Sequence, residues 1–408
     1  MSAPASAQGP DAALEHARAL LRSSPIIDGH NDLPWEIRRA EGAPRDVAAY
    51  DLRKRTPGHT DLERLKQGQV GAQFWSIYVD GEMGDSGYAR VQLEEFDIAR
   101  RMIARYPDRL SLALTADDIE RDAKRGRIAS LLGMEGGHVI ENSLGALRSY
   151  YALGGRYLTL THNVTIDWAD AALDTARHGG LTEFGREVVR EMNRLGMLVD
   201  MSHVSPATMS DALDVSEAPV IFSHSAARAL VDHPRNVPDS ILARLPKNGG
   251  VVMVTFVPQF VSNEFMAWEQ QADSMWQQLK TAVPDSAERR RQADAWKSGH
   301  APPSATLAQV ADHIEHVRDA AGVDHVGLGS DFDGIEHVPV GLEDVSRFPY
   351  LFAELIRRGW SDADLKKLAG RNVLRALYRA EATAARLRRE RQPSTRTIEE
   401  LDGATPRT

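Results

Sequence analysis

The chain has 408 residues, 42% of them hydrophobic and 26% charged, which are ordinary proportions for a globular protein with a large core. It contains no cysteine, which excludes disulfide bonds, thiolate metal sites and a cysteine nucleophile. Its 58 acidic residues outnumber 49 basic ones, and no Lys/Arg-rich strip with interleaved aromatics is present, so no nucleic-acid partner is expected.

The two ends of the chain are expected to be peripheral. Residues 1–24 lack the basic start and apolar stretch of a signal peptide and are predicted to form a helical segment outside the main domain. Residues 386–408 form a polar tail without a lipid-anchor signal. No segment is apolar enough over a sufficient length to span a bilayer. We therefore expect a cytoplasmic protein with no membrane partner.

Eight short, nearly continuous apolar runs are interpreted as strands of a parallel sheet that is buried on both faces. They cover residues 25–30, 72–79, 128–136, 156–162, 197–203, 219–224, 250–256 and 325–334. Helical patterns lie between them, with the clearest at 86–110, 182–196, 205–216 and 364–387. Repeated strand–helix alternation predicts a (β/α)8 TIM barrel over residues 25–385.

One segment interrupts this alternation. Residues 258–307 are polar and rich in Gln, Trp and Met, and they follow the seventh predicted strand. We interpret them as an insertion on the catalytic face, either a lid or an oligomer contact. Its tryptophans, Trp268, Trp276 and Trp296, are expected to pack within the insertion rather than to form a ligand cage.

Ionisable side chains follow six of the eight predicted strands. In chain order they are His30 and Asp32, Glu135, His162, His203, His224 and Asp331. The C-terminal ends of barrel strands carry the active site, so these side chains should meet at one rim. A group of buried carboxylates needs a cation among them, and imidazole with carboxylate suits zinc, manganese or iron. The pattern predicts a catalytic metal site.

The first of these pairs has its own geometric logic. Residues i and i+2 of a strand point to the same side, so His30 and Asp32 can bind one ion. The alternative is a turn in which Asp28, Asn31 and Asp32 cap the next element. The other strand ends favour the metal site.

Seven motifs in chain order carry a resemblance to a known family. They are "DGHNDLPW", "GMEGGH", "RYLTLTHN", "DMSHVS", "PVIFSHS", "RNVPD" and "GSDFDGIEHVPVGLEDVSRFP", and they span roughly residues 25 to 380. Together they resemble the zinc-dependent membrane (renal) dipeptidase family, peptidase family M19 of the amidohydrolase superfamily. The resemblance implies an amidohydrolase-like barrel, a homodimer and two zinc ions per chain. It implies hydrolysis of dipeptides with a free C-terminal carboxylate, and we expect these to include L-Xaa-D-Xaa dipeptides.

The resemblance also assigns the metal ligands. His30 and Asp32 would bind the first zinc, and His203 and His224 the second. Glu135 would bridge the two ions.

Three further roles follow from the same resemblance. His162 would contact the scissile carbonyl or its oxyanion, Arg235 would hold the substrate carboxylate, and Asp331 would shuttle the proton. From the residues alone, Arg235 could instead form a surface ion pair. Asp333 could be the functional acid or a loop cap, and His138 is expected near the site without binding metal.

The chain departs from the mammalian members, which are secreted, disulfide-linked and lipid-anchored. The segment after the seventh strand also looks less typical of the family, which leaves the substrate open. One alternative is an amidohydrolase acting on an N-acyl amino acid, a β-lactam or a lactone. Another is a barrel that binds metal or peptide without turnover, which the complete set of ligand positions disfavours.

Overall fold

The computed structural model describes residues 11–83 and 87–403. Eight parallel strands close into a ring, because β2 pairs with both β1 and β4, and β1 pairs with β9. The ring consists of β1 (Ile26–Asn31), β2 (Val70–Tyr78), β4 (Ile128–Glu135), β5 (Gly155–Thr159), β6 (Leu198–Asp200), β7 (Ile221–Ser225), β8 (Val251–Val254) and β9 (Val326–Leu328). Each matches one of the eight predicted runs, and the predicted (β/α)8 barrel is confirmed.

A ninth strand was not predicted. The three-residue β3 (Leu110–Leu112) pairs with residues 128–130 of β4, and β5 pairs with residues 132–135 of the same strand. The two therefore occupy successive halves of the β4 edge that faces away from β2. β3 lies outside the closed ring.

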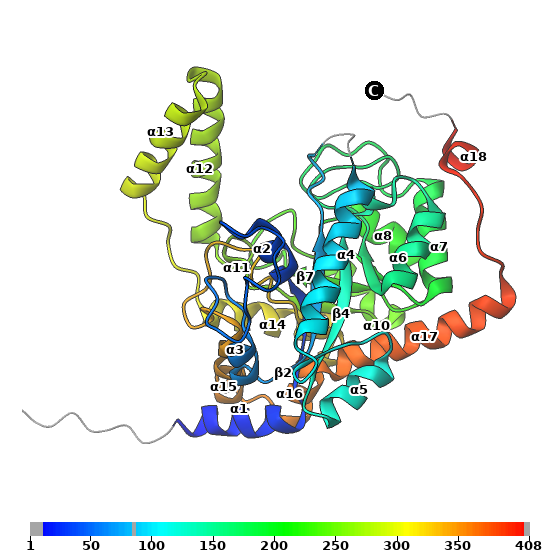
Figure 1. The fold of residues 1–408 in the computed structure, drawn as a ribbon, viewed down its shortest axis with the longest axis horizontal. Coiled ribbons are helices and arrows are strands. Elements are labelled where there is room, and N and C mark those ends of the chain that lie inside the picture. Colours follow the sequence, from blue (N-terminus) through cyan, green and yellow to red (C-terminus); the bar gives the residue numbers. More distant parts are fainter. Residues whose placement is uncertain (1–10, 84–86, 404–408) are drawn as a thin grey trace, which may run out of the picture.

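Helices surround the strands (Figure 1). They are α1 (Ala12–Ser23), α2 (Leu33–Arg39), α3 (Leu62–Gln67), α4 (Tyr88–Arg105), α5 (Ala116–Lys124), α6 (Leu144–Leu153), α7 (Glu183–Leu195), α8 (Pro206–Val215), α9 (Asp239–Leu242), α10 (Leu245–Asn248), α11 (Pro258–Val261), α12 (Asn263–Ala282), α13 (Ser286–Gly299), α14 (Leu307–Ala321), α15 (Phe348–Arg357), α16 (Asp362–Lys366), α17 (Asn372–Glu390) and α18 (Ile398–Asp402). Short turns η1 (Gly137–Ile140), η2 (Val323–His325), η3 (Val345–Arg347) and the π-helical η4 (Lys367–Arg371) complete the chain.

The predicted helix signals are found in the structure. The Thr182 hydroxyl accepts from the Gly185 backbone N–H at the start of α7, and the helix ends at Gly196 with a φ of 81°. Ser205 caps α8 in the same way, followed by Pro206 at the first helical position. The predicted segments 86–110 and 364–387 correspond to α4 and to α16–α17, with residue 86 outside the described part of the chain.

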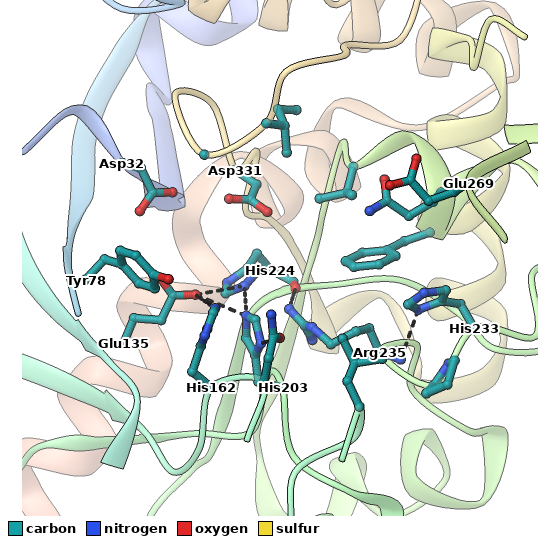
Figure 2. A pocket seen from close by; sticks show the side chains of 18 of the residues that line it. Asp32, Tyr78, Glu135, His162, His203, His224, His233, Arg235, Glu269 and Asp331 are labelled. Carbon is teal, nitrogen blue, oxygen red and sulfur yellow. Dashed lines mark hydrogen bonds and ion pairs between the residues drawn. The ribbon is translucent and has the colours of Figure 1, made fainter. Parts of the chain in front are cut away.

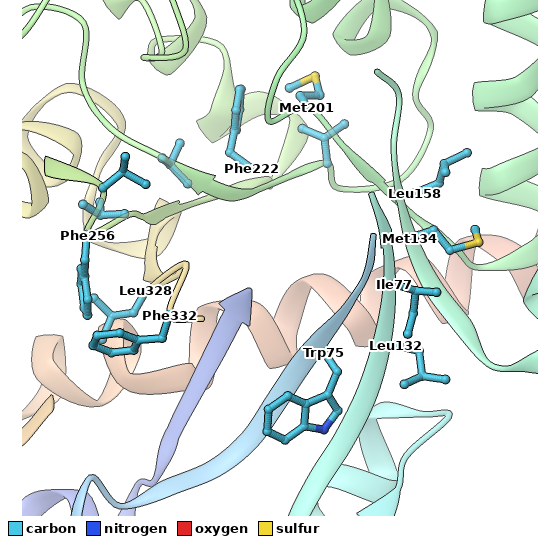
Figure 3. Close-up of a cluster of buried hydrophobic side chains, with 14 of the residues drawn as sticks. Trp75, Ile77, Leu132, Met134, Leu158, Met201, Phe222, Phe256, Leu328 and Phe332 are labelled. Carbon is cyan, nitrogen blue, oxygen red and sulfur yellow. The ribbon is translucent and has the colours of Figure 1, made fainter. Parts of the chain in front are cut away.

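Two hydrophobic clusters lie on opposite faces of the strands because successive side chains alternate. Trp75 and Leu132 belong to the outer cluster, which packs under the helices (Figure 3). Their neighbours Phe74 and Leu131 belong to the second cluster, which also includes Val373 of α17. Helix α17 thus closes the N-terminal end of the barrel with apolar side chains, leaving the C-terminal end for polar chemistry.

The segment predicted as an insertion forms α11, α12 and α13. Helices α12 and α13 run as a hairpin that stands out from the barrel (Figure 1). Within it, the Trp268 ring lies 6.2 Å from that of Trp296 and 5.5 Å from that of Phe265. These contacts agree with the predicted packing inside the segment for Trp268 and Trp296, whereas Trp276 lines a cavity beside the hairpin.

The terminal helices pack on the barrel. α1 contacts α15, and the Phe184 N–H at the start of α7 donates to the Asp402 carboxylate of α18. α17 continues past residue 385 to Glu390. The outermost parts of the predicted peripheral segments, residues 1–10 and 404–408, lie outside the described residues. Within the described ranges, no helix combines the length and apolarity needed to cross a bilayer.

Candidate metal centre and substrate pocket

The C-terminal ends of the strands surround a cavity of about 590 Å³ (Figure 2). Seven of the eight residues predicted for the site line it: Asp32, Glu135, His162, His203, His224, Arg235 and Asp331. The eighth, His30, is fully buried against them. All of the predicted site residues are therefore brought to one place.

The Glu135 carboxylate lies at the middle of the group. Its Oε1 is 3.0 Å from His203 Nε2 and 3.5 Å from His224 Nε2, and its Oε2 is 3.4 Å from His30 Nε2. Ser76 donates a hydrogen bond to Oε2 at 3.1 Å. One carboxylate therefore faces histidines with both oxygens.

The hydrogen bonds of two histidines leave bare nitrogens facing each other. His203 Nδ1 lies 3.0 Å from the Asn163 amide oxygen, and His224 Nδ1 lies 2.8 Å from Ser223 Oγ, whose own hydrogen goes to Asp200. Each ring therefore carries its hydrogen on Nδ1. Burial holds the pKa of both rings well below the ordinary value, so both are neutral. Their Nε2 lone pairs nonetheless meet at 2.8 Å, a contact that needs a cation.

His30 repeats this arrangement. The Tyr157 hydroxyl donates to the Gly29 carbonyl at 3.3 Å and accepts from His30 Nδ1 at 2.9 Å. The buried His30 Nε2 has no hydrogen-bond partner among the described residues and faces Asp32 Oδ2 at 3.2 Å. Three ring nitrogens and several carboxylates converge here. Although burial opposes a charged ring, the neighbouring Tyr157, Glu135 and Asp32 raise the pKa of His30 well above its ordinary value, so positive charge is favoured at this point. The residues therefore fit divalent cations.

The potential ligands form overlapping groups. Three sets have ligand atoms within 4.8 Å of one another: His30–Glu135–His224, Glu135–His162–His203 and His30–Asp32–Asp331. Glu135 is shared by two sets and His30 by two, so the sets adjoin rather than stand apart. This donor set offers room for more than one ion, with Glu135 at the junction.

Asp331 lies across the cavity from the histidines. Its Oδ1 is 3.9 Å from His30 Nε2, and its backbone has a φ of 67°, in the left-handed region that non-glycine residues rarely adopt. Burial, with the charges of Asp32 and Glu135, raises the pKa of Asp331 to about 8. The strained backbone holds a proton-carrying group over the centre.

Asp333 and His138 occupy different surroundings. Asp333 Oδ1 accepts from the His59 backbone N–H at 2.6 Å, and the Asp333 N–H donates to His59 Nδ1 at 3.0 Å. This pairing ties the loop after β9 to the loop before α3. His138 Nε2 bonds the Val79 carbonyl at 3.0 Å, so it holds the chain beside the site.

Arg235 is a buried arginine, not a surface one. It is 1% exposed and forms no ion pair within 4.0 Å among the described residues. Its Nη2 donates to the His224 carbonyl at 3.5 Å, and its guanidinium lies 5.2 Å from the Phe260 ring centre. In the part of the chain that the structure describes, its Nη1 has no hydrogen-bond partner. Burial lowers the pKa of Arg235 to about 10, still well above neutrality. A charged fork with a free donor at a cavity wall fits a carboxylate.

His162 forms the opposite wall with residues that sequence reasoning missed. Its Nε2 is 4.0 Å from Glu135 Oε1, and its ring packs 5.0 Å from Tyr78 at the end of β2. Trp35 packs edge-on against Tyr78 at 4.8 Å. Tyr78 was not predicted because the predicted site comprised only imidazole, carboxylate and guanidinium groups. An aromatic residue at a strand end is the signal that could have found it.

The support behind the histidines was also missed. Asp200 is fully buried at the end of β6 and accepts from Ser223 Oγ at 2.6 Å and from Thr159 Oγ1 at 2.5 Å. Through Ser223 it orients His224. An acidic residue inside the apolar run of 197–203 is the signal that marks it.

The comparisons with known proteins agree with this geometry. The family described as membrane dipeptidase (peptidase family M19) matches residues 14–391. The chain belongs to this family. It is thus a peptide-bond hydrolase of a metallopeptidase family, as the seven motifs predicted.

Individual relatives cover nearly the whole chain. Dipeptidase verJ of Clonostachys rogersoniana is 42% identical over 386 residues, which cover 92% of this chain and 89% of that protein. The crystal structure of the probable dipeptidase PvdM from Pseudomonas aeruginosa has a TM-score of 0.80 at 26% identity, covering 92% and 100% of the two chains. A metallopeptidase from Rhodobacter sphaeroides, bound to a phosphinate mimic of the dipeptide L-Ala-D-Ala, has a TM-score of 0.72 at 26% identity, covering 87% and 99%.

Proposed function

We propose that this member of the family is a dinuclear zinc dipeptidase that cleaves dipeptides with a free C-terminal carboxylate, including L-Xaa-D-Xaa dipeptides. The observation that carries the proposal is the convergence of three bare imidazole nitrogens on one carboxylate, with an unpaired buried arginine in the same cavity. The first feature suits cations, and the second suits the end of a short peptide.

The ligand assignment is the one that the family resemblance implies. His30 and Asp32 would hold one zinc, His203 and His224 the other, and Glu135 would bridge them, since its two oxygens face the two sides. When bound, the ions supply a Lewis acid for the peptide carbonyl and a water of lowered pKa.

The remaining side chains position and protonate the substrate. Asp331 is placed to accept a proton from the attacking water and to return it to the leaving amine. His162, at the cavity wall 4.0 Å from Glu135, is placed to donate to the carbonyl oxygen as negative charge develops there.

Arg235 accounts for the choice of a short substrate. Its free donor would bind the C-terminal carboxylate, and because Arg235 is fixed in the wall, it measures the distance from that carboxylate to the scissile bond. The dipeptide mimic bound to the Rhodobacter sphaeroides neighbour supports a D-residue at the C-terminus. A homodimer stays a prediction from the family resemblance, and a cytoplasmic location stays a prediction from the sequence.

The test is to purify the protein, measure its metal content by elemental analysis, and assay the same sample on dipeptides with L and D C-terminal residues. Two zinc ions per chain and cleavage of free dipeptides, with C-terminal amides resisting, are the expected results. Two metals without dipeptide cleavage would move the substrate to an N-acyl amino acid, β-lactam or lactone. A folded protein that binds no metal would contradict the proposed centre.

A further inference from the structure

One stripe of helix α12 faces the cavity. Met266, Glu269, Gln270 and Asp273 follow the i, i+3, i+4, i+7 spacing of a helix face, and all four line the pocket above the metal centre. The buried side chains of the same helix, Phe265, Trp268 and Ala272, lie on the neighbouring stripe. The α12–α13 hairpin thus presents two carboxylates to the substrate pocket.

The pocket continues beneath this hairpin. A second cavity of about 460 Å³ shares five wall residues with the first: Gln259, Glu269, Asp273, Gly334 and Ile335. Its further lining includes the apolar side chains of Trp268, Met275 and Trp276 and the charged side chains of Arg290, Asp294, Lys297 and Glu336. Glu269 and Asp273 therefore line both cavities, and a long side chain that reached them would lie at the boundary between the two.

The position of Arg235 decides which part of a dipeptide meets this wall. Figure 2 shows Glu269 on the same side of the pocket as Arg235, with Asp32 and Tyr78 opposite. Phe260 of α11, just before α12, lies against the Arg235 guanidinium. If Arg235 holds the C-terminal carboxylate, the C-terminal residue lies next to the hairpin and the N-terminal residue lies toward Tyr78.

The carboxylates in this wall lack partners. Among the described residues, neither Glu269 nor Asp273 forms a side-chain hydrogen bond or an ion pair within 4.0 Å. Burial and the charge of Asp273 raise the pKa of Glu269 above its ordinary value. Lys297 and His337 act on Glu269 only at longer range. Glu269 is half-buried and Asp273 is exposed beside it, and a cation between two like charges stabilises both.

We propose that Glu269 and Asp273 select dipeptides whose C-terminal residue carries a long cationic side chain, as in lysine or arginine. The methylene groups would lie along the apolar walls of the passage, and the charged head would reach the two carboxylates at the junction of the cavities. The proposal rests on the proposed function, because Arg235 must anchor the C-terminal carboxylate.

The test compares kcat/KM for Ala-Lys, Ala-norleucine and Ala-Glu, each with an L or a D C-terminal residue. Norleucine matches the lysine stem without the charge. In the preferred stereochemical series, we expect kcat/KM for Ala-Lys to exceed that for Ala-norleucine about tenfold. This factor corresponds to one charge-assisted hydrogen bond. Glu269→Gln should bring the lysine-to-norleucine ratio close to one, and Glu269→Arg should favour Ala-Glu.

Glu264→Gln is the matched control, because Glu264 is exposed on the first turn of the same helix and lines neither cavity. It should leave the ratio as in the wild type. Equal kcat/KM for Ala-Lys and Ala-norleucine would overturn the inference, and so would a lysine-to-norleucine ratio that Glu269→Gln leaves unchanged. In either case, cleavage of Ala-norleucine would still support the proposed dipeptidase activity. A preference for Ala-Glu would assign recognition to Arg290 and Lys297 instead. Cleavage of none of the dipeptides would overturn the proposed function itself.

Discussion

The metal centre and the α12 wall form two halves of one pocket, but they are built differently. At the centre, three of the histidines that face Glu135, namely His30, His203 and His224, have their other nitrogen fixed by Tyr157, Asn163 and Ser223 respectively. On α12, Glu269 and Asp273 have no such partners within residues 11–83 and 87–403. In the described part of the chain, the metal-facing histidines are thus held by hydrogen bonds, whereas the carboxylates assigned to selectivity are not.

The metal centre and the α12 wall also differ in how far their residues are buried. His30, Glu135, His203 and His224 are all buried at the ends of barrel strands. Only 3 of the 20 residues of α12 are buried, so the hairpin adds little to the core. Substitutions in the hairpin can therefore change the choice of substrate without disturbing the barrel. By contrast, substitutions at the metal centre are expected to affect the reaction itself.

The largest effect should come from Asp331→Asn. An asparagine keeps the shape of the side chain but cannot carry the proton, so kcat should fall about 10³-fold with metal content unchanged. Steady-state kinetics and elemental analysis on the same sample check this. Asp333→Asn is the control, because Asp333 is engaged with His59, and it should cost far less in kcat. Near-wild-type turnover by the Asp331 variant would remove it from the reaction.

Arg235→Lys should lower kcat/KM for free dipeptides about 10²-fold, because an ammonium cannot reproduce the guanidinium fork in a buried site. The comparison substrate is the dipeptide C-terminal amide, which has no carboxylate to lose. The gap between acid and amide substrates should therefore narrow in the variant. An unchanged gap would show that another group binds the carboxylate.

Ser223→Ala tests the locking of the centre. It breaks the Asp200–Ser223–His224 chain, so metal affinity should fall about 10- to 100-fold. Metal retained during titration with a chelator measures this. Ser130→Ala is a suitable control, since the Ser130 hydroxyl is buried in β4, has no hydrogen-bond partner among the residues the structure describes, and lies toward the other end of that strand from Glu135. Equal metal retention by the two variants would mean that orientation of His224 is unimportant.

The smallest effect on chemistry should come from Trp296→Ala. Trp296 packs on Trp268 and stacks on His300 at 4.4 Å, so its loss should loosen the hairpin by about 1–2 kcal/mol. Limited proteolysis should cut faster within residues 263–299, with kcat for Ala-Ala within about twofold of wild type. A large fall in kcat would show that the two regions are coupled more tightly than their packing indicates.

The sequence was a good guide to the barrel because buried parallel strands are continuous apolar runs. The missed strand, β3, is only three residues long, and its first residue ends a segment with helical spacing. Strand ends were less accurate: the run predicted to reach His162 is a strand only to Thr159, since tertiary pairing ends there.

The candidate ligands could be named for a geometric reason. All strands of a parallel barrel point their C-terminal ends at one mouth, so residues after each strand must meet. The support behind them could not be derived in this way. Asp200 and Tyr157 act only through partners on other strands, and those pairings depend on register. The placement of Glu269 in the pocket wall could not be predicted either, because the helical periodicity of an insertion does not say where the insertion docks.

The closure of the ring between β1 and β9 also dictates an order of events during synthesis. Asp28, two residues before His30, accepts hydrogen bonds from the backbone N–H and the hydroxyl of Ser330, 302 residues further along the chain. Strand β1 therefore leaves the ribosome first but cannot complete its pairing until β9 has been synthesised, and one edge of β1 stays unpaired until then. Such a chain depends on protection from aggregation until it is nearly complete.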